Sequence, residues 1–357
     1  MAAVDEEKGE TPSMRILMPD SRLNRGERLL QQSFMKMFAF NGLLVGAFVL
    51  LAFLPISKLP DRMARPISVE TLSIQRVELP APTAPLTLAG AWVLDAADPR
   101  FTGLSGLALD RGGFLAVSDL GAVVRFDRPS ASQPRASIQD LRIGPGNFGS
   151  KFSRDAESLV RDPRGRGWWV GFERHHSLWL FDEGFTHALA SVDLGRFNWP
   201  DNRGAEGLLV HDGKLLALAE GGHDAVRIDD KALTLLKLHT NSDLAEAATA
   251  PDGSEWLLLR HKGMSGISEA IAPLLPVRDG FMAGPPWTLP KGEFDNYEGM
   301  AIEKLADGRW RFWLVTDNGH RIMARTLLVA LDYLPPAQSK SPATSAGPSS
   351  KLSTKAP

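Results

Sequence analysis

The residues best placed to do chemistry are acidic side chains within a repeated sequence pattern. The pattern is an acid and a glycine, an apolar run, an Asp-Gly turn, a second apolar run and a further acid. It is clearest in Glu206-Gly207-Leu208, which is followed by Asp212-Gly213 and then by Glu220 and His223. Carboxylates that converge in a confined space repel one another, so they need a cation, raised pKa values or basic partners.

Near-copies of this pattern recur at intervals of roughly 40–50 residues, the spacing of propeller blades. The five openings are Ser105-Gly106-Leu107, Glu157-Ser158-Leu159, Glu206-Gly207-Leu208, Glu246-Ala247-Ala248 and Glu298-Gly299-Met300. The second apolar runs end at Asp119, Glu173, Glu220, Arg260 and Asp317. An Asp-Gly pair between two apolar runs is a strong hairpin signal. Several short strands per repeat therefore predict four-stranded blades.

We expect an all-β fold, a β-propeller of five to six blades over residues 86–334. The strand Leu86 to Leu94 is expected to complete the last blade and close the ring. Counting the openings gives five blades, and six if Ile67 to Leu94 contributes more than a closing strand. A β-sandwich is the alternative fold, but it would not explain a repeating opening motif.

The first strand of a propeller blade lines the central channel, and the second strand returns antiparallel to the same mouth. The opening and closing acids should therefore converge there. Oxygen-only ligands suit a hard divalent cation, and calcium fits best. The expected metal ligands are Glu157, Glu206, Glu298, Asp119, Glu173, Glu220 and Asp317. The alternative is that each acid hydrogen-bonds backbone of its own or the next blade.

Histidine and basic residues recur beside these acids and are expected at the same mouth. Imidazoles there could act as general bases, phosphate donors or metal ligands. The catalytic candidates are Glu206, His223, His320 and Arg260. The candidate substrate contacts are Arg154, Arg203, Arg174, His175, Arg260, His261, Lys262 and Arg321. The alternatives are histidines that cap turns and an Arg260 that only neutralises neighbouring acids. A serine nucleophile is weakly supported, because no G-x-S-x-G motif occurs.

The overall composition excludes several kinds of function. The chain has 357 residues, a net charge of -2 and no cysteine. It therefore has no disulfide, no Cys-ligated zinc and no thiol nucleophile. The charge balance and the absence of a dense basic stripe argue against nucleic-acid binding.

The two ends of the chain differ from the repeat region. Residues 1–36 form a polar extension, and the 18-residue apolar run Met37 to Leu54 follows a basic flank. That layout predicts a signal peptide or membrane anchor, with a buried core helix as the alternative. We therefore expect a periplasmic or otherwise extracytoplasmic protein that contacts the membrane only through residues 37–54. Residues 55–85 are expected to be a linker, and the Pro/Ser/Lys-rich residues 335–357 a disordered tail.

Five short motifs stand out, residues 202–208, 295–300, 155–158 and 315–318 and the pair Arg260-His261. Together they resemble one bacterial family, called "esterase-like activity of phytase". The resemblance covers roughly Leu86 to Tyr333. It implies an exported propeller with phosphoester or ester hydrolase activity. The fourth copy departs from the acid-glycine opening, and the first has Ser105 in place of Glu.

Three functions are compatible with these residues. The first is a metal-assisted hydrolase acting on a small anionic or ester substrate, in which calcium polarises a phosphoryl or acyl oxygen and Arg260 or Arg203 steadies the anion. The second is a propeller-type lactonase that uses one divalent metal. The third is a non-catalytic binding or scaffold module of the cell envelope. No partner protein can be inferred from the sequence.

Overall fold

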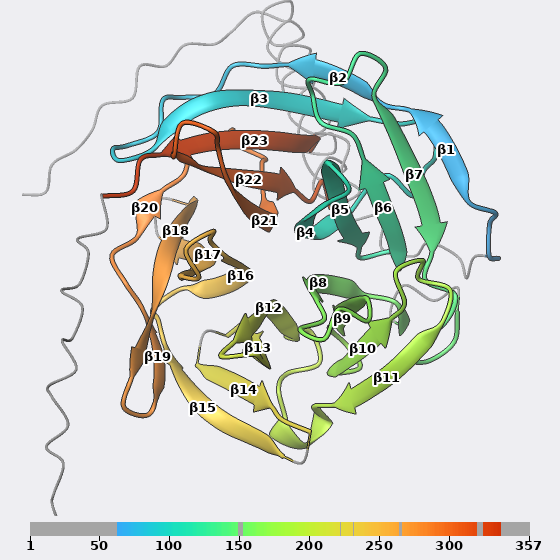
Figure 1. Cartoon of the computed structure of the whole chain (residues 1–357), viewed down its shortest axis with the longest axis vertical. Helices are drawn as coiled ribbons and strands as arrows, with labels where there is room; N and C mark the ends of the chain where they lie inside the picture. The colour runs from blue at the N-terminus through green and yellow to red at the C-terminus, as the bar shows by residue number, and fades with distance from the viewer. Residues whose placement is uncertain are drawn as a thin grey trace, which may run out of the picture. The chain divides into compact units, whose positions relative to one another are not determined.

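The computed structural model describes residues 63–148, 153–221, 223–230, 232–263, 266–319 and 324–336. Apart from one 3-10 turn, η2 (Gly195–Phe197), the regular secondary structure of this part is β-strand. The strands form five antiparallel blades whose innermost strands face a common centre (Figure 1). The predicted propeller is confirmed, and its described part has five blades.

Blades 1 and 2 each contain four consecutive antiparallel strands, named from the centre outward. Blade 1 consists of β4 (Leu104–Asp110), β5 (Gly113–Ser118), β6 (Ala122–Phe126) and β7 (Arg135–Asp140). Blade 2 consists of β8 (Ala156–Arg161), β9 (Trp168–Phe172), β10 (Ser177–Phe181) and β11 (Ala188–Asp193).

Blades 3 and 4 are joined at their outer edges into one nine-stranded sheet by a parallel pairing of β15 with β19. Blade 3 consists of β12 (Ala205–His211), β13 (Lys214–Ala219), β14 (Asp224–Ile228) and β15 (Leu233–His239). Blade 4 consists of β16 (Asp243–Thr249), β17 (Glu255–Gly263), β18 (Gly266–Val277) and β19 (Gly280–Ala283), with β20 (Trp287–Thr288) also paired to β18.

Blade 5 is completed by a strand from the N-terminal side of the ring. It contains β21 (Tyr297–Lys304), β22 (Trp310–Thr316) and β23 (Thr326–Tyr333), and its fourth strand is β3 (Thr87–Asp95), antiparallel to β23. This is the ring closure expected from the sequence. Two short strands lie in the segment expected to be a linker, β1 (Ser68–Thr71) and β2 (Ser73–Arg76). They extend the outer edges of blades 1 and 5 and form no sixth blade.

The turns between the first two strands of the blades follow from their Asp and Gly residues. In blade 3, His211 pairs with Lys214 across a two-residue turn, and φ is 49° at Asp212 and 72° at Gly213. Positive φ at both central residues is the geometry of the type I′ turn, which matches the twist of the paired strands. The predicted hairpin is confirmed there.

Apolar side chains fill the layers between adjacent blades. The layer between blades 4 and 5 contains Trp256 and Phe312, whose ring centroids lie 5.2 Å apart. The layer between blades 5 and 1 contains Trp313 and Phe114, at 4.9 Å. Because full burial of one such side chain stabilises the fold by about 2–3 kcal/mol, these layers hold the inner strands at fixed positions around the centre.

Several predicted segments lie outside the described residues, including the apolar run 37–54, the extension before it and the tail from residue 337. Within the described part of the chain, no helix has the length and apolarity that a bilayer crossing requires.

Candidate functional site

Each innermost strand carries one β-bulge, and three of the five bulges present a glutamate. The residue left without a partner is Glu157 in β8, Glu206 in β12 and Glu298 in β21. Bulges redirect side chains and are common beside active sites. Since all three lie near the start of an inner strand, they point to one end of the ring.

Pairing also corrects the alignment of the fourth repeat. In β16 the register shift lies between Leu244 and Glu246, so the bulged residue equivalent to Glu157 and Glu206 is Ala245. Glu246 therefore lies one position further along and is only 1% exposed. It accepts a hydrogen bond from its neighbour, the Ala247 N–H, at 2.8 Å. Burial raises the pKa of Glu246 well above its usual value.

The second strand of each blade ends beside the opening of the first. The N–H groups of the closing acids Glu173 and Glu220 donate to the carbonyl oxygens of Asp155 and Gly204, at 2.9 Å and 3.1 Å. Asp119 and Asp317 make the same bond to Gly103 and Asn296, each at 2.9 Å. This repeated contact returns the closing acids to the end of the ring where the bulged glutamates lie.

Carboxylates of blades 2 and 3 meet in two groups that share Glu173. Oxygen atoms of Asp155, Glu157 and Glu173 all lie within 4.8 Å of one another, and so do those of Glu173, Glu206 and Glu220. The structure thus brings together four of the predicted metal ligands and adds Asp155. Asp119, Asp317 and Glu298 belong to neither of these two groups.

The pKa values of these carboxyl groups are raised, because the acids are crowded together and few positive charges lie nearby. Burial and the neighbouring Asp155 carboxylate raise the pKa of Glu173 to about 8. Burial, with Asp155 and Glu206 nearby, raises the pKa of Glu157 well above its usual value. The pKa of Glu206 is also raised well above its usual value, mainly by burial and next by the nearby Glu220 carboxylate. In the absence of a cation, such acids relieve their repulsion by binding protons.

Blade 4 contributes a positively charged side chain, Arg260, near the bulged glutamate of blade 5. Arg260, whose side chain is 12% exposed, donates a hydrogen bond to Glu298, and its Nε lies 3.8 Å from the Glu269 carboxylate. Burial raises the pKa of Glu298 to about 7, although Arg260 lowers it. Glu269 also receives the Tyr297 N–H at 3.0 Å and Lys291 at 3.2 Å. These acids are neutralised by protein groups.

The other predicted basic residues differ in their exposure and in the groups that they contact. Arg203 and Lys262 both approach Asp243, at 3.6 Å and 2.8 Å, and remain partly exposed. Arg154 is buried, and its guanidinium donates to backbone carbonyls, among them Leu141 O at 3.0 Å. Arg174 is exposed and holds Asp155 at 3.0 Å, so it acts on one of the acidic groups.

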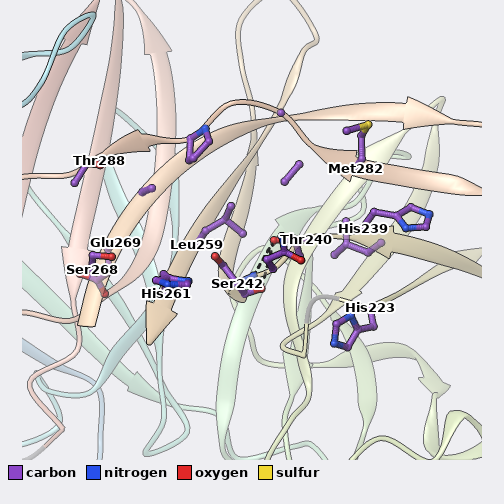
Figure 2. A pocket seen from close by; sticks show the side chains of 16 residues that line it. His223, His239, Thr240, Ser242, Leu259, His261, Ser268, Glu269, Met282 and Thr288 are labelled. Atoms are coloured by element: carbon purple, nitrogen blue, oxygen red, sulfur yellow. Dashed lines mark hydrogen bonds between the residues drawn. The ribbon is translucent and has the colours of Figure 1, made fainter. Parts of the chain in front are cut away.

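None of the described histidines belongs to either acidic group. His223 and His261 line a cleft of about 740 Å³ at blades 3 and 4, together with His239 (Figure 2). His175 is exposed, and its pKa is lowered first by partial burial and then by Arg154. His320 and Arg321 lie outside the described residues.

Comparison with known proteins gives the family of this region. A family model described as "Phytase-like: Esterase-like activity of phytase" matches residues 99–273. Residues 99–273 are a phytase-like region. The match confirms the resemblance seen in the sequence and runs from blade 1 into blade 4. Both acidic groups lie within it, and Glu298 and Asp317 lie beyond it. Among curated proteins, none matches the chain.

Solved structures similar to this chain come from varied proteins. A Xanthomonas campestris gluconolactonase is 11% identical, with 77% of this chain and 99% of that one covered and a TM-score of 0.39. The Cps50 β-propeller domain from Myceliophteria thermophila is 10% identical, with coverage of 74% and 100% and a TM-score of 0.39. Kuenenia stuttgartiensis hydrazine synthase is 12% identical, with coverage of 60% and 56% and a TM-score of 0.34. The chain thus spans about half of that synthase chain.

Some residues of the phytase-like site were not singled out from the sequence. Asp155 and Asp243 each stand two positions before a bulged residue, so alignment on the bulge would have found both. Glu269 lies within β18 and His239 ends β15, and neither position carries a repeat signal.

The donor set of the phytase-like site fits a hard cation. Both groups offer only carboxylate oxygens, the ligands that calcium and magnesium prefer. Glu206 is only 7% exposed. Among the described residues it has no hydrogen bond or ion pair. Arg260 lowers the pKa of Glu206 only through its charge, without direct contact. A buried carboxylate without a partner is costly, and a bound cation would remove that cost.

Proposed function

We propose that the phytase-like propeller is a metal-assisted hydrolase of phosphoesters or carboxylic esters. One observation carries the proposal. Glu173, Glu206 and Glu220 place oxygen atoms within 4.8 Å of one another, and Glu206 is buried without a partner among the described residues. This is an incomplete arrangement of charges that a divalent cation would complete.

The cation would be held by Glu173, Glu206 and Glu220, and calcium suits these oxygens best. When bound, it supplies a Lewis acid that polarises a phosphoryl or acyl oxygen and favours an activated water. The remaining tasks belong to the chain itself. Binding the substrate anion falls to Arg203 and Lys262, which are partly exposed beside Asp243 and have N–H groups to offer.

Proton transfer falls to Glu298. It lies outside both acidic groups, and Arg260 and Asn296 hold its carboxylate by hydrogen bonds, the latter at 2.7 Å. A general base works best when its pKa is near the working pH, and the pKa of Glu298 is raised to about 7. Arg260 fixes the orientation of Glu298 and keeps its pKa from rising further.

We also propose that the protein is exported and acts outside the cytoplasm, tethered or released through residues 37–54. The basic flank and the apolar run support this proposal. Fractionation of cells that express the full chain tests it. Recovery of the protein only in the cytoplasm would contradict it.

The experiment for the activity compares three substrate classes under controlled metal content. Purified protein is stripped with a chelator and assayed on phosphomonoesters, carboxylic esters and lactones, with and without added calcium. We expect turnover of the first or second class that returns with calcium and is lost in Glu206→Gln. Turnover of lactones alone would indicate a lactonase instead. The absence of turnover on all classes, with unchanged metal binding by Glu206→Gln, would favour a binding module.

A further inference from the structure

Glu173 is the residue that the two acidic groups have in common. Its carboxylate lies with Asp155 and Glu157 of its own blade, and with Glu206 and Glu220 of the next blade. Calcium–oxygen distances are about 2.3–2.6 Å, so two ligands of one ion lie at most about 5 Å apart. The atoms of each group satisfy this limit at 4.8 Å. Each group alone therefore has the dimensions of one cation site.

A second observation points to a ligand at this place. The Glu206 carboxylate is aimed into the shared cluster and is 7% exposed, with no hydrogen bond or ion pair among the described residues. Glu246 is also buried, but its Oε1 accepts the Ala247 N–H, its Oε2 has no hydrogen-bond partner among the described residues, and it belongs to neither group. The fold thus provides a backbone donor for one buried acid and leaves the other facing carboxylates.

The number of charges favours two cations over one. The two groups contain five carboxylates, with Glu173 counted once. One divalent ion would leave an excess of three negative charges, and among the described residues Asp155 alone of the five has a direct cationic partner, Arg174. Two divalent ions would leave an excess of one. Two-metal sites hold their ions about 3.5–4 Å apart, a separation that a single bridging carboxylate can span.

We propose that the phytase-like site binds two divalent cations bridged by the Glu173 carboxylate, with one oxygen on each ion. Asp155 and Glu157 hold the first ion, and Glu206 and Glu220 hold the second. This inference rests on the proposed function, because it concerns the same site. With two ions bound, the reacting oxygen of the substrate would contact both of them at the boundary between blades 2 and 3.

Cation stoichiometry tests the inference on the purified full chain. Calcium is titrated into the chelator-treated protein by calorimetry and equilibrium dialysis. Wild type is expected to bind two ions. Glu157→Gln and Glu220→Gln should each keep one, and Glu173→Gln should bind both at least tenfold more weakly. The matched control is Glu246→Gln, a buried acid outside both groups, which should still bind two.

A second measurement uses the wild type alone and does not depend on the folding of variants. Loading with manganese should give the electron paramagnetic resonance signal of a spin-coupled pair. A single bound ion with an uncoupled spectrum would overturn the bridged site and leave a one-metal hydrolase intact. Failure to bind any calcium or manganese would overturn the inference and the cation requirement of the proposed function together.

Discussion

Arg260 of blade 4 donates a hydrogen bond to the Glu298 carboxylate of blade 5. The same guanidinium faces Glu269, so one base serves two acids. In blades 2 and 3 the equivalent strand end carries Glu173 and Glu220 instead. The ring of acids is thereby divided into a half neutralised by protein groups and a half left for a cation.

Replacement of Arg260 by Met should move the pH dependence of activity. Arg260 lowers the pKa of Glu298, which is held at about 7. Without the guanidinium that pKa rises, so the acidic limb of the kcat/KM profile should shift to higher pH. Loss of one partner of a buried ion pair should also destabilise the fold by about 3 kcal/mol.

The matched control is Arg260→Lys, which keeps the charge but not the planar donor group. It should shift the profile less than Met does. A profile that stays at the wild-type position in Arg260→Met would show that Glu298 is not the titrating base.

Calcium should stabilise the folded protein, and Glu206→Gln should abolish most of that effect. A ligand that binds only the folded state at about 100 times its Kd stabilises it by about 2.7 kcal/mol. Thermal unfolding with chelator and with calcium measures the difference. Glu78→Gln, at an exposed position after β2, should respond like wild type. An equal calcium response in Glu206→Gln would remove that residue from the site.

The cation-free protein should lose stability as the pH rises from about 4.5 to 8. The folded pKa of Glu173 is raised to about 8 from a usual value of 4.5. Between these values the native state binds the extra proton, so the free energy of unfolding falls with rising pH. After screening by solvent we expect a loss on the order of 1–3 kcal/mol. Denaturant unfolding in chelator measures it.

Glu173→Gln should reduce this pH dependence, because the amide does not titrate, while Glu157 and Glu206, whose pKa values are also raised, still contribute to it. Calcium should also suppress it in wild type, since a cation replaces the proton. Stability that increases between pH 5 and pH 8 in chelator would contradict the raised pKa of Glu173.

Gly204→Ala should displace Glu173 and weaken cation binding. A Cβ at Gly204 would lie 2.5 Å from the Glu173 Cα, which is backbone and cannot rotate away. Overpacking of this kind typically costs about 1–3 kcal/mol, and we expect at least tenfold weaker calcium binding by calorimetry. At Gly184 the nearest atom would be 3.7 Å away. Gly184→Ala should bind calcium normally, and equal binding by both variants would exclude the steric argument.

Much of the fold could be predicted because each blade repeats a local signal. The Asp-Gly turns and the apolar runs beside them are properties of short segments. Closure of blade 5 by Leu86 to Leu94 was expected because the last repeat supplies only about three strands. The roles of β1 and β2 could not be predicted, since Ser68–Thr71 and Ser73–Arg76 only add to edges formed by distant strands. The parallel joining of β15 to β19 likewise depends on tertiary packing.

The sequence predicted at which end of the ring the candidate site lies. It predicted less well which residue of each inner strand occupies the bulge. Repeat position was enough to bring Glu157, Glu206 and the closing acids to one end. It misplaced blade 4, because a bulge is defined by the pairing of Leu244 with Leu259 and not by residue type. The sequence Glu246-Ala247 resembles the acid-glycine opening, but it lies one position after the bulged residue Ala245. Strand pairing, rather than the motif, decides which residue is redirected.

The pairing of β3 with β23 has a consequence for how the protein is made. β3 is synthesised before every other strand of the five blades, and β23, with which it pairs, is synthesised last. Pairing between distant segments is slow and exposes unpaired strand edges in the meantime. The ring therefore closes only after translation has passed Tyr333, and until then the edge of β3 that pairs with β23 stays unpaired.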